Sequence, residues 1–205
     1  MPTRSAQPFA SPKATATQPW VPTAFTYDNA VSIFAYLASE DATLSARAEV
    51  LGEGLLYAQA NNFPFNDGRF AQGYFVNVAS SAEAYITPAA YPYYFYRSTV
   101  GDQAWAGMVL AQLYFRTRQA WYLTGALLVA NWIVTNAYNT AGAGGYSFGT
   151  IINQYNGSES SPNGKSTEHN IDAFAFHHAD FDGRSVLANV TYRNVYDVRD
   201  SARHL

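Results

Sequence analysis

Three stretches of similar form decide the fold of this chain: Thr26-Tyr27-Asp28-Asn29-Ala30, Val100-Gly101-Asp102-Gln103-Ala104 and Thr167-Glu168-His169-Asn170-Ile171. Each follows a polar or glycine-rich stretch and runs into an apolar, aromatic segment, as expected at the start of a helix. A helix start that recurs along a chain indicates repeated helical units. The pattern therefore predicts an all-α protein of stacked αα-hairpins, with acidic and polar side chains gathered where the repeating helices begin.

Apolar residues at helical spacing extend each of these starts. Gly52 and Gly54 interrupt the second segment, since glycine weakens a helix interior. Two helices joined by a short turn form an αα-hairpin, and the segment after residue 100 fits that description best. The expected elements are helices over 28–39 and 42–60, a helix around 105–114, a turn at 116–119, a return helix over 122–139, and a helix that starts near Ser166.

The segments between the helices carry turn signals and aromatic residues. The run 66–69 is a turn between aromatics and is consistent with a β-hairpin. The glycine-rich run 142–149 lacks the Lys-Ser/Thr ending of a phosphate-binding loop and follows a helix, so we expect it to pack closely or to form the rim of a cleft. The expected organisation is a flexible arm over 1–25, a helical domain over 26–180 and an atypical tail over 181–205.

The composition excludes several classes of function. The net charge is -3 and only 13% of residues are charged, so nothing indicates a nucleic-acid partner. The chain has no cysteine, which excludes disulfides and thiolate chemistry. No apolar run reaches the roughly 18 residues of a membrane span, so no membrane partner is expected. Aromatic residues make up 16% of the chain, and they suit either the seams between helices or platforms for sugar rings.

Several motifs resemble a known family. The segments 26–30, 101–106 and 144–146 and above all Lys165-Ser166-Thr167-Glu168-His169-Asn170-Ile171-Asp172 are similar to bacterial, often exported proteins of the (α/α)6 toroid type. That superfamily includes six-hairpin glycoside hydrolases and polysaccharide lyases. The resemblance covers about residues 25–178 and implies a partial toroid of about three hairpins, with a cleft at the starts of the inner helices. A twin-arginine export signal is missing, and an apolar signal core is not visible either.

A carbohydrate-active hydrolase of glycosidase type is the function that this resemblance favours. Glycoside hydrolysis needs two carboxylates across a cleft, and Asp28 with Glu168 is the pair we select as catalytic residues. Asp28 and Asp102 also have a purely structural interpretation, because aspartate often caps helices. The expected substrate-binding residues are Tyr27, Arg69, Asp102, Trp105, Tyr146, His169 and Asp172.

Two other functions stay open. Gly145-Tyr146-Ser147-Phe148-Gly149 matches the Gly-x-Ser-x-Gly string, so a serine esterase or lactonase with Ser147 and His169 is one alternative. The other is a non-catalytic module that binds a glycan or a partner. Adjacent His177 and His178 make a poor metal chelate, and we expect neither a metal nor a cofactor. Because repeat units need neighbours to bury their faces, an incomplete ring predicts a homo-oligomer.

Overall fold

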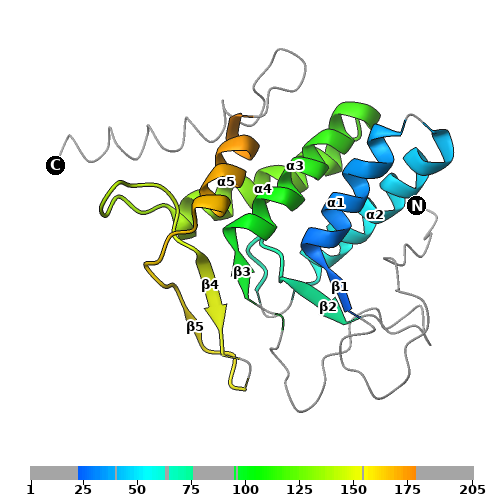
Figure 1. Cartoon of the computed structure of the whole chain (residues 1–205). Helices are drawn as coiled ribbons and strands as arrows, with labels where there is room; N and C mark the ends of the chain where they lie inside the picture. The colour runs from blue at the N-terminus through cyan, green and yellow to red at the C-terminus, as the bar shows by residue number, and fades with distance from the viewer. Residues whose placement is uncertain are drawn as a thin grey trace.

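The computed structural model describes residues 23–39, 41–62, 65–75, 95, 97–153 and 155–178 (Figure 1). Within them the chain is predominantly helical, as expected. The elements are β1 (Thr23–Phe25), α1 (Thr26–Ala38), α2 (Ala42–Ala60), β2 (Gly73–Phe75), β3 (Ser98–Thr99), α3 (Val100–Thr117), α4 (Ala120–Ala137), β4 (Gly149–Ile152), β5 (Glu159–Ser160) and α5 (Thr167–His178).

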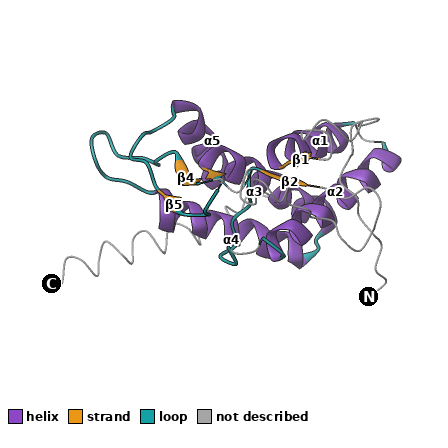
Figure 2. Cartoon of the chain, turned by 90° about the horizontal axis from the view of Figure 1, so that it is seen from below, coloured by secondary structure: helices purple, strands orange, loops and turns teal. Residues whose placement is uncertain are grey.

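The five described helices form two layers. Helices α1, α3 and α5 lie side by side with α3 in the middle, and α2 and α4 pack against them as a second layer (Figure 2). Each of the pairs α1–α2 and α3–α4 is a helical hairpin with a short turn, so the predicted hairpins are confirmed. This arrangement brings the starts of α1, α3 and α5 to the same end of the layer (Figure 1).

Helix α3 is the centre of the core. Helices contact it from both layers, so it is buried around most of its circumference, as a central helix should be. Small residues let its neighbours approach closely, while larger side chains fill the space between the layers. Its buried residues are Val100, Gly101, Asp102, Gln103, Ala104, Ala106, Gly107, Val109, Leu110, Ala111 and Leu113.

Helix α2 has the bounds that the sequence predicts. Its N-cap is Asp41, whose carboxylate accepts hydrogen bonds from the backbone N–H groups of Thr43 and Leu44. A Cβ at Gly52 would lie 2.3 Å from Leu113 Cδ1, whereas a Cβ at Gly54 would meet nothing within 4 Å. Gly52 therefore interrupts the helical pattern because close packing against α3 requires it.

The short strands correct two expectations. Residues 66–69 form a bend and not a β-hairpin; β2 instead pairs antiparallel with β1. Because β1 occupies Thr23–Phe25, the last three residues of the predicted arm are ordered. Strands β3, β4 and β5 form a second antiparallel sheet. Since β1 and β3 run directly into α1 and α3, both sheets fix the starts of these helices.

Some predictions fall on other parts of the chain. The rest of the predicted arm and the tail after residue 180 lie outside the described residues. In the described part of the chain, no helix has the length and hydropathy required to cross a bilayer.

Candidate functional site

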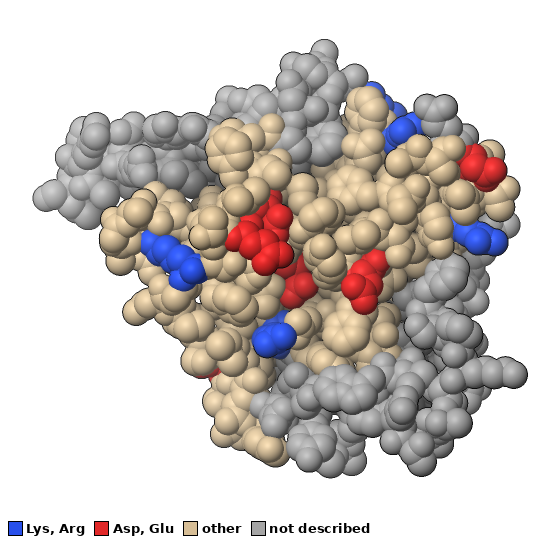
Figure 3. Space-filling model, viewed as in Figure 1, with Lys and Arg blue, Asp and Glu red and all other residues tan. Residues whose placement is uncertain are grey.

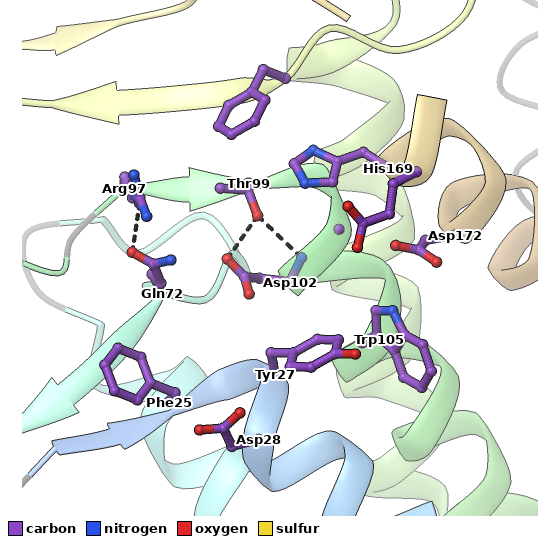
Figure 4. Close-up of a pocket in the computed structure, with 13 residues that line it drawn as sticks. Phe25, Tyr27, Asp28, Gln72, Arg97, Thr99, Asp102, Trp105, His169 and Asp172 are labelled. Carbon is purple, nitrogen blue, oxygen red and sulfur yellow. Dashed lines mark hydrogen bonds between the residues drawn. The ribbon is translucent and has the colours of Figure 1, made fainter. Parts of the chain in front are cut away.

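A cavity of about 360 Å³ lies where α1, α3 and α5 begin (Figure 4). The sequence predicts that the repeated helix starts meet, and Asp28, Asp102 and Glu168 do line one cavity. Tyr27 and Trp105 also line it, as expected for substrate-binding residues. The full lining is Phe25, Tyr27, Asp28, Gln72, Arg97, Thr99, Gly101, Asp102, Trp105, Phe148, Glu168, His169 and Asp172.

Each repeated start also carries a side-chain amide directly after the residue that lines the cavity. Gln103 follows Asp102, and its amide both donates to the carbonyl of Phe70 and accepts from the N–H of Phe70, at 2.8 Å each. Asn170 follows His169 and makes the same pair of bonds with Tyr146, at 2.8 and 2.9 Å. The repeat thus alternates a residue that lines the cavity with a residue that holds a neighbouring loop.

The first repeat follows the same rule in a simpler form. Asn29 follows Asp28, and its Nδ2 donates to the carbonyl of Phe25 at 2.7 Å. The three amides were not among the residues predicted to be functional. The sequence itself indicates these amides, because an amide residue follows the cavity residue in all three helix starts.

The motif that begins at Lys165 has a structural part and a cavity part. Lys165 Nζ donates to the carbonyls of Ala141 and Gly144, at 2.6 and 2.7 Å, so it fixes the glycine-rich loop. Ser166 Oγ accepts from the N–H of His169 and serves as the helix cap, as predicted. The cavity part consists of Glu168, His169 and Asp172.

Asp102 is the most deeply buried carboxylate of the cavity, with 8% of its surface exposed. Burial raises the pKa of Asp102 and the charge of Asp28 adds to the rise, while Thr99, His169 and Arg97 oppose it. Thr99 Oγ1 donates to Asp102 Oδ2 at 2.7 Å and accepts from the N–H of Asp102 (Figure 4). Thr99, rather than Asp102, is therefore the cap of α3.

Asp172 lies on α5 across the cavity from Asp102 (Figure 4). Burial raises its pKa, the charge of Glu168 adds to the rise, and Trp105 and His169 oppose it. Trp105 in turn packs edge-on against Tyr27, with ring centroids 5.3 Å apart. The cavity thus combines carboxyl groups that are hard to ionise with an aromatic wall.

His169 lines the cavity, as do most of the residues predicted to bind substrate. A hydrogen bond with Asp172 is a natural expectation at this spacing, but His169 Nδ1 is buried and has no hydrogen-bond partner among the described residues. The ring instead packs against Phe148, with centroids 4.7 Å apart, and covers Gly101. A Cβ at Gly101 would lie 2.6 Å from His169 Cδ2, so this glycine makes room for the imidazole.

Two predicted substrate-binding residues lie outside the lining of the cavity. Arg69 is buried and forms ion pairs with Asp67 and Glu159, so its charge is already neutralised. Its guanidinium also lies over the Phe65 ring, 4.3 Å from the centroid. Tyr146 stacks on a histidine ring of α5 instead of facing the cavity. These residues stabilise the fold, and Phe25, Gln72, Arg97 and Phe148 take their place in the lining.

The structure gives little support to the serine alternative. Ser147 is only 5% exposed and does not line the cavity. A nucleophile elbow needs a helix after the serine, but strand β4 follows here.

His177 is buried without a hydrogen-bond partner among the described residues, and burial lowers its pKa to about 4. No cluster of metal-ligating side chains occurs in the part of the chain that the structure describes.

Comparisons with protein-family models and with curated proteins find no match for this chain.

Proposed function

We propose that the chain is a carbohydrate-active hydrolase of glycosidase type, with its active site in the cavity at the starts of α1, α3 and α5. One observation carries the proposal: carboxylates from three helix starts line one concave, aromatic-walled site. Paired carboxylates are the groups that glycoside hydrolysis uses. Aromatic side chains such as Trp105 and Tyr27 suit the apolar faces of sugar rings.

The burial of Asp102 revises the assignment of the acid. A general acid must keep its proton near the working pH, and a raised pKa favours that state. Asp102 is therefore the group that donates a proton to the leaving oxygen as the glycosidic C–O bond breaks. Glu168 and Asp28 remain the two candidates for the second carboxylate. This group removes a proton from the attacking water or stabilises positive charge on the sugar ring.

We also propose that the two hairpins and α5 belong to a partial α/α toroid. The alternation of an inner layer (α1, α3, α5) with an outer layer (α2, α4) supports this arrangement. Ile171 and Phe174 on α5 are each 62% exposed, which suits a helix that receives a further neighbour. A second copy of the chain would cover this face, so light scattering should report a dimer; a monomer at micromolar concentration would contradict it.

The test is a hydrolysis screen on the purified chain, with oligosaccharide panels beside short ester and lactone substrates. We expect release of reducing sugar by the wild-type protein and its loss in Glu168→Gln. The matched control is Asp41→Asn, since asparagine keeps the helix cap at a position remote from the cavity. Cleavage of esters alone, lost in Ser147→Ala, would replace this function with the serine alternative; binding of glycans without turnover would replace it with a binding module.

A further inference from the structure

The charges around the cavity are strongly unbalanced. Four carboxylates line it, from Asp28, Asp102, Glu168 and Asp172. None of the four forms an ion pair with a described residue. In Figure 3 acidic side chains gather on the face where the helices begin, with few basic groups among them.

The positive groups of the lining offset this charge only in part. Arg97 and His169 favour the ionised form of Asp102, but neither forms an ion pair with it. Arg97 is exposed, and its Nε donates to Gln72 Oε1 at the edge of the cavity (Figure 4). His169 is the other basic residue, and its Nδ1 is buried without a hydrogen-bond partner among the described residues. Like charges in a confined site repel each other, and a bound cation removes that repulsion.

The aromatic wall adds a second preference for positive charge. Trp105 and Tyr27 line the cavity beside the carboxylates, and the face of an aromatic ring attracts a cation. An acidic sugar would instead bring a further negative group into the site. Such a ligand needs arginine or lysine side chains around it, and among the described lining residues only Arg97 provides one.

We propose, building on the hydrolase function above, that the cavity selects amino sugars with a free, protonated amino group over neutral and acidic sugars. The ammonium group binds among Asp28, Glu168 and Asp172, while the sugar ring packs against Trp105. The substrate class is thus a glycan that contains unacetylated hexosamine units.

Calorimetry with three disaccharide probes tests this assignment without relying on turnover. The probes are a glucosamine disaccharide, its N-acetylated form and cellobiose, which has a hydroxyl in place of the amine. We expect the glucosamine disaccharide to bind at least about tenfold more tightly than either neutral probe, with a preference that decreases as salt rises. Asp172→Asn should reduce this preference severalfold, and Asp41→Asn should leave it unchanged.

The outcomes separate this inference from the function on which it rests. Equal binding of all three probes would overturn the preference for amino sugars and leave the carbohydrate site in place. A preference that survives in Asp172→Asn and in Glu168→Gln would also overturn it, because the ammonium group would then bind elsewhere. Failure of every probe to bind would overturn both proposals.

Discussion

Two acidic clusters in the described part of the chain differ in how their charges are compensated. Around Arg69, the carboxylates of Asp67 and Glu159 each form an ion pair with the guanidinium, and the pKa of Asp67 is lowered. In the cavity, Asp102 and Asp172 have raised pKa values and no ion pair with a described residue. The first cluster is closed and stabilises the fold. The second lines a cavity, and we propose that its carboxyl groups act on a ligand there.

The contrast between the two clusters separates ion-paired residues, which serve the fold, from unpaired carboxylates, which are the candidates for function. Burying charge is costly unless it is paired. Asp102 is buried without an ion-pair partner among the described residues, so its ionised form costs stability, as is common for carboxyl groups in active sites. Arg69, which the sequence suggests as a substrate-binding residue, lies outside the cavity lining, and two ion pairs neutralise its charge.

Arg69→Met should have the largest effect on stability. It leaves two carboxylates without their partner and removes the contact with the Phe65 ring. We expect a loss of about 2–4 kcal/mol in the free energy of unfolding, measured by urea denaturation. Arg97→Met, at the rim of the cavity, should change this free energy by less than about 0.5 kcal/mol. Similar losses in the two variants would contradict the contrast between the clusters.

Gly101→Ala should alter the cavity while leaving the fold intact. The new methyl group would collide with the His169 ring, so the imidazole must shift from its place in the cavity lining. We expect turnover to fall about tenfold, because a misplaced group of about 1 Å has effects of this order or larger. Gly54→Ala is the control: its Cβ meets nothing within 4 Å, and it should stabilise the helix by about 0.5–1 kcal/mol. Unchanged turnover in Gly101→Ala would show that the position of His169 is unimportant.

The pH dependence of stability should have opposite signs at the two clusters. The lowered pKa of Asp67 adds stability above its ordinary value of 3.8, which is lost as the pH falls through the folded pKa. The raised pKa of Asp102 has the reverse effect: ionisation costs stability as the pH rises from 3.8 through the folded pKa, and the cost is absent below 3.8.

Thermal unfolding of two variants between neutral pH and about pH 3 tests these signs. Asp67→Asn should be less stable than the wild-type protein at neutral pH, and Asp102→Asn should be equally or more stable. Both differences should shrink at low pH, because the wild-type carboxyl groups are then protonated. The same sign in both variants would mean that the two clusters do not differ in the way described.

The sequence predicts the helices better than it predicts the partners of polar side chains. Apolar spacing and caps are local, so the bounds of α2 and the meeting of three helix starts follow from the sequence alone. The role of Arg69 depends on Glu159, which lies 90 positions away in the chain. No local pattern reveals such a pair. The raised pKa of Asp102 likewise depends on burial in the folded chain, which no local pattern shows.

The repeated helix starts share amide residues as well as acidic and polar residues. The amides Asn29, Gln103 and Asn170 occupy matching places. Gln103 and Asn170 hold neighbouring loops by hydrogen bonds to their backbone, whereas Asn29 bonds the carbonyl of Phe25 just before its own helix. In contrast, Phe148 and Arg97 reach the cavity from positions directly before strands β4 and β3. Their places depend on strand pairing, which short strands of two to four residues do not reveal in a sequence.

Asp102→Asn provides the most direct test of the central claim that the cavity carboxylates act on a ligand and do not stabilise the fold. Asparagine has the same shape and can still accept the hydrogen bond from Thr99. The substitution therefore removes only the negative charge and the ability to act as a general acid. Turnover and the free energy of unfolding should be measured on the same preparation. We predict at least a hundredfold loss of glycan hydrolysis with equal or greater stability. Unchanged hydrolysis together with a loss of about 2 kcal/mol or more would show that Asp102 is a structural residue, and would contradict the account.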